Sequence, residues 1–143
     1  MERAKLGEAE RHCAAQGERL TPLRRRVLEI LQDAGQPLGA YAILEVLARD
    51  DRRRPLPPTV YRALDFLLAQ GLAHKIHSQN AFLPCCAIGR VHTAELFVCR
   101  RCGVAREVPQ DGEVARDERP PGFEVEAVVL EVRGVCGGCR EPA

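Results

Sequence analysis

The chain has 143 residues, and its 21 lysines and arginines nearly balance its 20 aspartates and glutamates, which leaves a net charge of +1. This length fits one compact domain or two very small ones, and the modest charge argues against non-specific polyanion binding. No apolar run is long enough to cross a bilayer, and residues 1–13 are too charged for a signal peptide, so we expect no membrane partner and a cytoplasmic location.

The small net charge conceals an asymmetry along the chain. Residues 1–75 carry 13 Lys/Arg against 10 Asp/Glu, whereas residues 76–143 carry 8 against 10. Most of the basic excess lies in two arginine blocks, residues 24–26 and 52–54. The planar guanidinium fork suits phosphate, but an arginine-rich helix face is also ordinary solvated surface. Charge alone leaves both interpretations open.

The first half of the sequence predicts four helices. Thr21 can cap the second of them, and Pro22 fits its first position, where a missing amide is no loss. Gly71 is the expected stop of the fourth helix. From apolar spacing and these boundary signals we expect helices at residues 2–16, 22–34, 40–49 and 58–70.

The fourth helix divides its residues between two faces. One apolar stripe contains Val60, Ala63, Leu64, Leu67 and Leu68. Tyr61 and Arg62 lie largely off this stripe, near the helix N-terminus, where a recognition helix touches base edges in the major groove. The alternative is an amphipathic helix whose Tyr61 and Arg62 simply face solvent, and this helix alone favours that alternative.

After Gly71 the pattern changes to short alternating segments. Residues 72–76 and 81–83 flank a turn and predict a β-hairpin, which completes a winged helix-turn-helix unit. Further strands are expected at residues 94–98, 103–108 and 123–133. The predicted fold is α+β, with a winged-helix domain at 1–86, a hinge linker at 87–91 and a small α/β domain at 92–143.

Two CxxC pairs are the strongest motif in the chain. Two residues between cysteines allow both thiolates to reach one ion, and two such turns supply the sulfurs of a closed tetrahedral zinc site. The alternative is a pair of chance CxxC motifs or a disulfide-linked loop, although seven cysteines favour a reducing compartment. We therefore expect a structural zinc site at Cys99, Cys102, Cys136 and Cys139.

Four other residues have the chemistry of metal ligands without forming a compact local motif. They are His74, Cys85, His92 and Glu107. Zinc accepts imidazole, thiolate and carboxylate donors together, so these residues are candidates for a second site. The alternative is four unrelated polar residues, which the residues by themselves favour. His77, Cys86 and Cys13 could equally be ligands or inert side chains.

Taken together, several segments resemble the ferric uptake regulator family and, within it, the zinc uptake regulator branch. They cover nearly the whole chain and include the sequences RLTPLR at 19–24, PTVYRALDFL at 58–67, GL at 71–72, HK at 74–75, HT at 92–93, FVCRRCG at 97–103 and LEVRGVCGGC at 130–139. Together these segments are far more specific than either CxxC pair.

The resemblance implies two zinc ions per chain. The structural ion would be held by the four knuckle cysteines, and the regulatory ion by His74, Cys85, His92 and Glu107. Iron-responsive relatives carry a histidine cluster before the first knuckle, where this chain has His92 alone, so zinc is the expected signal. Iron, manganese or peroxide sensing within the same family is the alternative.

The resemblance also implies a homodimer that binds a palindromic operator in double-stranded DNA. The C-terminal domain would dimerise, and DNA contacts would fall at Tyr41, Thr59, Tyr61 and Arg62. The expected function is zinc-dependent repression of zinc uptake genes, with no enzymatic activity and no small organic substrate. Residues 109–121 are shorter and more polar than the matching helix of relatives, which leaves the dimer packing open.

Overall fold

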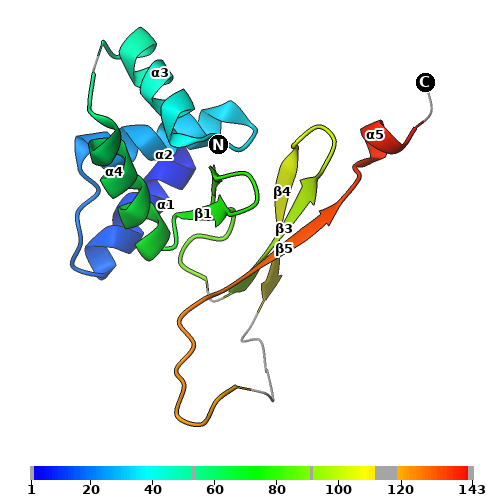
Figure 1. Ribbon diagram of the computed structural model, residues 1–143. Coiled ribbons are helices and arrows are strands. Elements are labelled where there is room, and N and C mark those ends of the chain that lie inside the picture. Colours follow the sequence, from blue (N-terminus) through cyan, green and yellow to red (C-terminus); the bar gives the residue numbers. More distant parts are fainter. Residues whose placement is uncertain (1, 53, 91, 112–118, 142–143) are drawn as a thin grey trace. The chain divides into compact units, whose positions relative to one another are not determined.

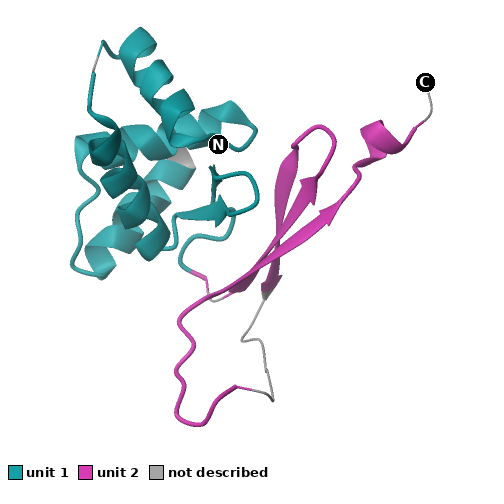
Figure 2. Cartoon of the chain, viewed as in Figure 1, with its two compact units in different colours: residues 1–89 teal, residues 90–143 magenta. Residues whose placement is uncertain are grey.

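The computed structural model describes residues 2–52, 54–90, 92–111 and 119–141. The chain forms two compact units, residues 1–89 and 90–143 (Figure 2). The boundary between the units falls inside the segment predicted as a linker, of which residue 91 lies outside the described residues. Among the described residues, no helix is both long and apolar enough to span a bilayer.

Unit 1 contains the four expected helices, each within about one residue of its predicted bounds. Thr21 caps the second helix, since its side-chain oxygen accepts a hydrogen bond from Arg24 N at 3.5 Å, and Gly35 ends it with φ = 64°. The helices are α1 (Glu2–Ala15), α2 (Pro22–Ala34), α3 (Ala40–Asp50) and α4 (Pro57–Ala69) (Figure 1).

The helices of unit 1 enclose one apolar core. Its largest fully buried side chains include Leu28, Leu31, Ile43, Leu47, Leu64 and Leu67. Burial of each such leucine or isoleucine contributes about 1.5–3 kcal/mol relative to an exposed side chain. Cys13 lies fully buried in the same core, and burial raises the pKa of its thiol. Cys13 is therefore a packing residue.

A β-hairpin follows α4 and completes the winged helix-turn-helix fold. Its strands β1 (Ala73–Ile76) and β2 (Ala81–Pro84) are antiparallel, with His74 opposite Leu83. Leu38, which lies shortly before α3, forms an antiparallel bridge with Phe82 of β2. The two residues exchange backbone hydrogen bonds of 2.9 and 2.8 Å. The hairpin is thereby fixed to the start of α3.

Unit 2 is a three-stranded sheet of order β4-β3-β5. The central strand β3 (His92–Cys99) pairs antiparallel with β4 (Ala105–Asp111) and parallel with β5 (Val128–Gly134). A short helix, α5 (Gly137–Arg140), follows β5.

The third strand expected in this half was predicted too long. Residues 123–127 are not in a strand, although the prediction placed its start at residue 123. The reason lies in the register: Val128 pairs with Thr93, next to the first residue of β3. Residues before Val128 have almost no partner strand left, so their alternating pattern forms no ladder. Phe123 is consequently exposed.

Candidate metal centres and nucleic-acid interface

The four knuckle cysteines converge at one end of the sheet of unit 2. Because β3 and β5 are parallel, their carboxyl ends meet at the same edge, where Cys99 lies opposite Gly134. A hydrogen bond of 2.8 Å from Arg100 N to Gly134 O joins the two knuckles. The sulfurs of Cys99, Cys102, Cys136 and Cys139 all lie within 4.8 Å of one another.

The hydrogen bonds of this cluster favour one thiolate. Cys136 N donates to Cys99 Sγ at 3.3 Å, and this bond is the main reason why the pKa of Cys99 falls to about 5. The pKa of Cys139 rises to about 12, chiefly through its hydrogen bond with the side chain of Cys136. The cluster thus stabilises a first negative charge and resists further ones, a conflict that a divalent cation relieves.

The sulfur geometry supports a metal site rather than a disulfide. None of the seven cysteines, all of which lie in the described residues, forms a disulfide. The Cys102 and Cys136 sulfurs are 3.7 Å apart, well beyond the S–S bond length of about 2.0 Å. Four convergent sulfurs match the complete ligand set of a closed structural zinc site.

The second predicted ligand set is divided between the two units, and His92 and Glu107 belong to unit 2. His92 Nε2 lies 3.2 Å from Glu107 Oε2, with side chains only 9% and 2% exposed. His92 Nδ1 lies 2.8 Å from the carbonyl oxygen of Arg90. A carbonyl only accepts, so Nδ1 carries the proton, and in a neutral ring Nε2 then presents a lone pair.

Two acceptors at 3.2 Å need a proton or a cation between them. A cation there would bind both the imidazole nitrogen and the carboxylate. Orientation of one ring nitrogen by a backbone carbonyl is the usual outer-shell arrangement of a metal-binding histidine. The pair therefore fits half of a zinc site.

His74 and Cys85 belong to unit 1. His74 lies on β1 and Cys85 directly after β2, and both are buried. Cys85 N donates to Leu72 O at 2.9 Å, and Ala87 N donates to Cys85 Sγ at 3.3 Å. This sulfur therefore has a fixed position at the end of the hairpin, and sulfur is a ligand that zinc accepts.

The two alternative ligands considered from sequence are placed differently. His77 lies in the turn of the hairpin and is exposed, and Cys86 is exposed next to buried Cys85. Burial thus separates Cys85 from its neighbour, a distinction that the sequence did not make.

The residues predicted to contact DNA lie on α3 and α4. Tyr41 is 67% exposed near the start of α3, and Arg62 is exposed on α4. Thr59 and Tyr61 are half-buried, and Tyr61 packs against the apolar core of unit 1. Tyr61 was expected to lie largely off the apolar stripe, but part of its ring belongs to the core.

The first arginine block, residues 24–26, is engaged within the fold. The Arg24 guanidinium stacks over the Phe66 ring of α4, 3.7 Å from its centroid. Arg25 pairs with Glu10 at 3.0 Å, and Arg26 Nε donates to both carboxylate oxygens of Asp51 at 3.0 and 2.8 Å. These contacts join α2 to the other helices, so the block has a structural role.

Comparison with known proteins identifies the family. The sequence profile of the ferric uptake regulator family matches residues 15–133. The chain belongs to the ferric uptake regulator family. The chain is also 38% identical over 140 residues to the zinc uptake regulation proteins of Escherichia coli K12 and Shigella flexneri, which covers 95% of this chain and 81% of each relative.

Solved structures of this family are similar to the chain over nearly its whole length. A zinc uptake regulator complexed with zinc and DNA is 36% identical with a TM-score of 0.82, covering 97% of this chain and 95% of the other. Holo XcZur is 41% identical with a TM-score of 0.76, covering 94% and 95%. The predicted resemblance to the zinc uptake regulator branch is confirmed.

Iron-responsive members share the fold at lower identity. The ferric uptake regulator from Francisella tularensis with iron is 18% identical, with a TM-score of 0.53 and coverage of 87% of this chain and 96% of the other. This likeness concerns the fold alone.

Proposed function

We propose that this protein is a zinc-responsive DNA-binding repressor that controls zinc uptake genes. The observation that carries the proposal is the convergence of four knuckle sulfurs, together with a buried His92–Glu107 pair, in a chain similar to a regulator solved with both zinc and DNA. Neither a winged helix nor a metal site alone would distinguish a metal-dependent repressor from other small domains.

The knuckle site would hold a structural zinc ion. The sheet of unit 2 leaves several large apolar side chains exposed, among them Phe97, Val108, Val129 and Val132. A unit of about 50 residues with so little enclosed core needs a metal or a partner for stability. Zinc at the four cysteines, and association of two copies through unit 2, would supply both.

The mixed site would hold the regulatory ion. His74 and Cys85 would contribute an imidazole and a thiolate from unit 1, and His92 and Glu107 an imidazole and a carboxylate from unit 2. Zinc bound by all four would restrict how the units are oriented, and so hold the two winged helices of a dimer at the spacing of successive major grooves. Two zinc ions per chain follow from the two sites.

Zinc would act through differential affinity. An ion that binds the DNA-competent arrangement better than other arrangements shifts the population toward it, and DNA must tighten zinc binding by the same factor. Such coupling is typically about 1–3 kcal/mol. On DNA, Arg62 would read bases from α4, with Tyr41, Thr59 and Tyr61 as further contacts to a palindromic operator.

Sensing of iron, manganese or peroxide is the competing function within the family. The single thiolate ligand and the absence of a histidine cluster around His92 favour zinc over these signals. As for chemistry, a catalytic zinc keeps an open position for water, whereas the knuckle site offers four protein sulfurs, so we propose no enzymatic activity. We also propose a cytoplasmic location, since seven cysteines favour a reducing compartment.

The test is the metal specificity of DNA binding. Protein with its knuckle site filled is titrated with zinc, ferrous iron or manganese, and its affinity for a palindromic AT-rich promoter fragment is measured by gel shift. Zinc should strengthen binding at the lowest free concentration. Stronger activation by iron or manganese would assign the chain to another branch, and DNA binding indifferent to all three metals would refute the proposal.

A further inference from the structure

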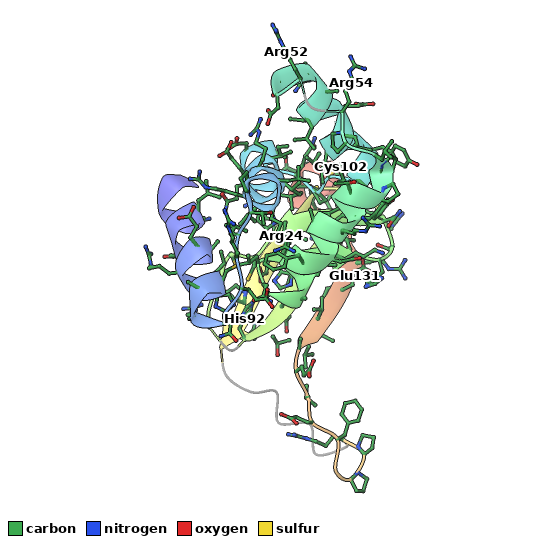
Figure 3. All side chains as sticks on the ribbon, turned by 90° about the vertical axis from the view of Figure 1, so that its left-hand side faces the viewer. Arg24, Arg52, Arg54, His92, Cys102 and Glu131 are labelled. Carbon is green, nitrogen blue, oxygen red and sulfur yellow. The ribbon has the colours of Figure 1, made fainter. Side chains whose placement is uncertain are left out.

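The loop between α3 and α4 presents two arginines to solvent. Arg52 and Arg54 are both exposed, and both side chains extend away from the fold at the end of α3 (Figure 3). Arg53, between them, lies outside the described residues. The arginines at residues 24–26 form contacts inside unit 1. Arg52 and Arg54, in contrast, have no role in the function proposed above.

The acidic residues beside the loop are already engaged by other arginines. Asp51 accepts two hydrogen bonds from Arg26 Nε, and Asp50 accepts one from Arg49 Nε at 2.9 Å. Within the described part of the chain, neither Arg52 nor Arg54 forms an ion pair or a side-chain hydrogen bond. Their charges are therefore available to an external anion.

The backbone of Arg52 strengthens this interpretation. Its φ is 53°, in the left-handed region that glycine or asparagine usually occupies after a helix. An arginine at such a position is disfavoured locally, and no internal ion pair of its side chain offsets the cost. Strain of this kind is found where a side chain serves a function.

The start of α4 explains why arginines are needed there. A helix N-terminus normally binds phosphate through its free amide groups, but the first two residues of α4 are Pro57 and Pro58, which have no N–H. Arg54 lies three residues before Pro57, so the chain between them spans at most about 11 Å. That reach is comparable to the width of the major groove, about 12 Å, which α4 would enter.

We propose that Arg52 and Arg54 bind the DNA backbone phosphates that border the groove entered by α4. This inference rests on the proposed function, and it assigns to the loop a sequence-independent role: the two guanidinium groups fix the position of α4, whereas Arg62 reads the bases. Guanidinium binds phosphate with two parallel hydrogen bonds, which suits positioning better than a lysine point charge.

The experiment measures how DNA affinity depends on salt. Zinc-loaded wild-type protein is used to select a duplex from a randomised library. Binding of this duplex, and of a random duplex of equal length, is then followed by fluorescence anisotropy from 50 to 300 mM salt (roughly the range over which counterion release is resolved). Two double variants are compared with wild type: Arg52→Gln with Arg54→Gln, and Arg52→Lys with Arg54→Lys. The control is Arg25→Gln, which removes an arginine charge from α2 at the position where it pairs with Glu10 of α1.

The slope of log K against log salt is negative, and loss of one protein–phosphate interaction reduces its magnitude by about 0.9. Loss of two arginines from each chain of a dimer removes four interactions, so the magnitude should fall by about 3.6. The double glutamine variant should show this change and bind both duplexes more weakly by the same factor. The lysine variant should keep the slope, and Arg25→Gln should match wild type. The two double variants should keep the wild-type Tm, because Arg52 and Arg54 are exposed. Arg25→Gln loses an exposed ion pair with Glu10, so all binding is measured well below the Tm of this control.

The outcomes distinguish this inference from the proposed function. If wild type selects a duplex but the double glutamine variant keeps the wild-type slope, the phosphate role is wrong and the proposed function stands. If the variant binds only the selected duplex more weakly, the arginines read bases, which also overturns the inference. If zinc-loaded wild type selects no duplex, both proposals fail.

Discussion

His92 Nε2 lies 3.2 Å from Glu107 Oε2, while the other nitrogen of the same ring lies 2.8 Å from the carbonyl oxygen of Arg90. The carbonyl fixes the tautomer of a neutral ring, and this leaves two acceptors facing each other in a buried environment. The arrangement requires a proton or a cation. A zinc ion held by both groups would meet this requirement, which makes the pair the most direct target for perturbing the proposed regulatory site.

The first prediction concerns the carboxylate of this pair. Glu107→Gln removes the negative charge but keeps the shape, so it should weaken zinc binding at the regulatory site by at least about tenfold while the knuckle zinc is retained. Zinc-dependent DNA binding should weaken in parallel. The measurements are zinc titration against a competing chelator and DNA anisotropy.

Glu95→Gln is the matched control, since Glu95 lies on β3 of the same sheet but its carboxylate contacts the exposed Gln110 side chain. It should behave as wild type. Equal zinc affinity in the two variants would remove Glu107 from the site.

The second prediction separates two adjacent cysteines. Cys85 is buried and its sulfur accepts a hydrogen bond from Ala87 N, whereas Cys86 is exposed. Cys85→Ser should therefore abolish the zinc response of DNA binding, and Cys86→Ser should leave it unchanged. Zinc content per chain, measured by atomic emission after dialysis, should fall only for the first variant. The reverse result would make Cys86 the ligand.

The third prediction uses the different thiol pKa values in the knuckle cluster. Cys99, with a pKa of about 5, is already a thiolate at pH 7, whereas Cys139, with a pKa of about 12, is protonated. Zinc must displace a proton from Cys139 but not from Cys99. Cys139→Ser should thus lower the number of protons released on zinc binding at pH 7 by about one, and Cys99→Ser should not change it.

The sign of the pH dependence follows from the same values. As pH falls through about 5, Cys99 also takes up a proton that zinc must displace, so zinc affinity should fall more steeply below pH 5 than above it. Proton release is measured by calorimetry in buffers of different ionisation enthalpy. An equal decrease in proton release in the two serine variants would contradict the assignment.

The fourth prediction concerns the exposed arginine of α4. Arg62→Ala should weaken binding to a selected operator by about 1–3 kcal/mol and relax sequence preference at one position of each half-site. Folding should be intact, because the side chain is exposed. Arg11→Ala, at an exposed position of α1, serves as the control. An unchanged operator affinity would exclude Arg62 from the interface.

The fifth prediction concerns stability. The bifurcated hydrogen bond from Arg26 Nε to both carboxylate oxygens of Asp51 joins α2 to the residue that caps α3, and both side chains are largely buried. Asp51→Asn should lower the free energy of unfolding in urea by about 1 kcal/mol. Asp50→Asn, at a more exposed carboxylate, should lower it by about 0.3 kcal/mol. Equal effects would show that the bifurcated hydrogen bond adds no stability beyond that of an exposed ion pair.

Local signals in the sequence were sufficient to predict most elements of the fold. Thr21 and Pro22 marked the start of α2 because capping and a missing amide are local properties. The four knuckle cysteines were predictable for a similar reason: two-residue spacing constrains each pair without reference to the rest of the fold, and two pairs make four ligands.

Features that depend on distant partners were not predictable. Residues 123–127 have a strand-like pattern, but the register of β5 on β3 leaves them almost no partner. The arginines at 24–26 gave the same charge signal as those at 52–54, and only tertiary contacts with Glu10, Asp51 and Phe66 separate the two blocks. Likewise, burial distinguished Cys85 from Cys86, which adjacent identical residues could not do.

The central claim is that zinc at the regulatory site and DNA stabilise the same state of the protein. The most direct measurement is the zinc affinity of that site, with the knuckle site filled, in the absence and presence of saturating operator DNA. DNA should tighten zinc binding by roughly 5–150-fold, and by the same factor by which zinc tightens DNA binding. Identical zinc affinities with and without DNA would contradict the account.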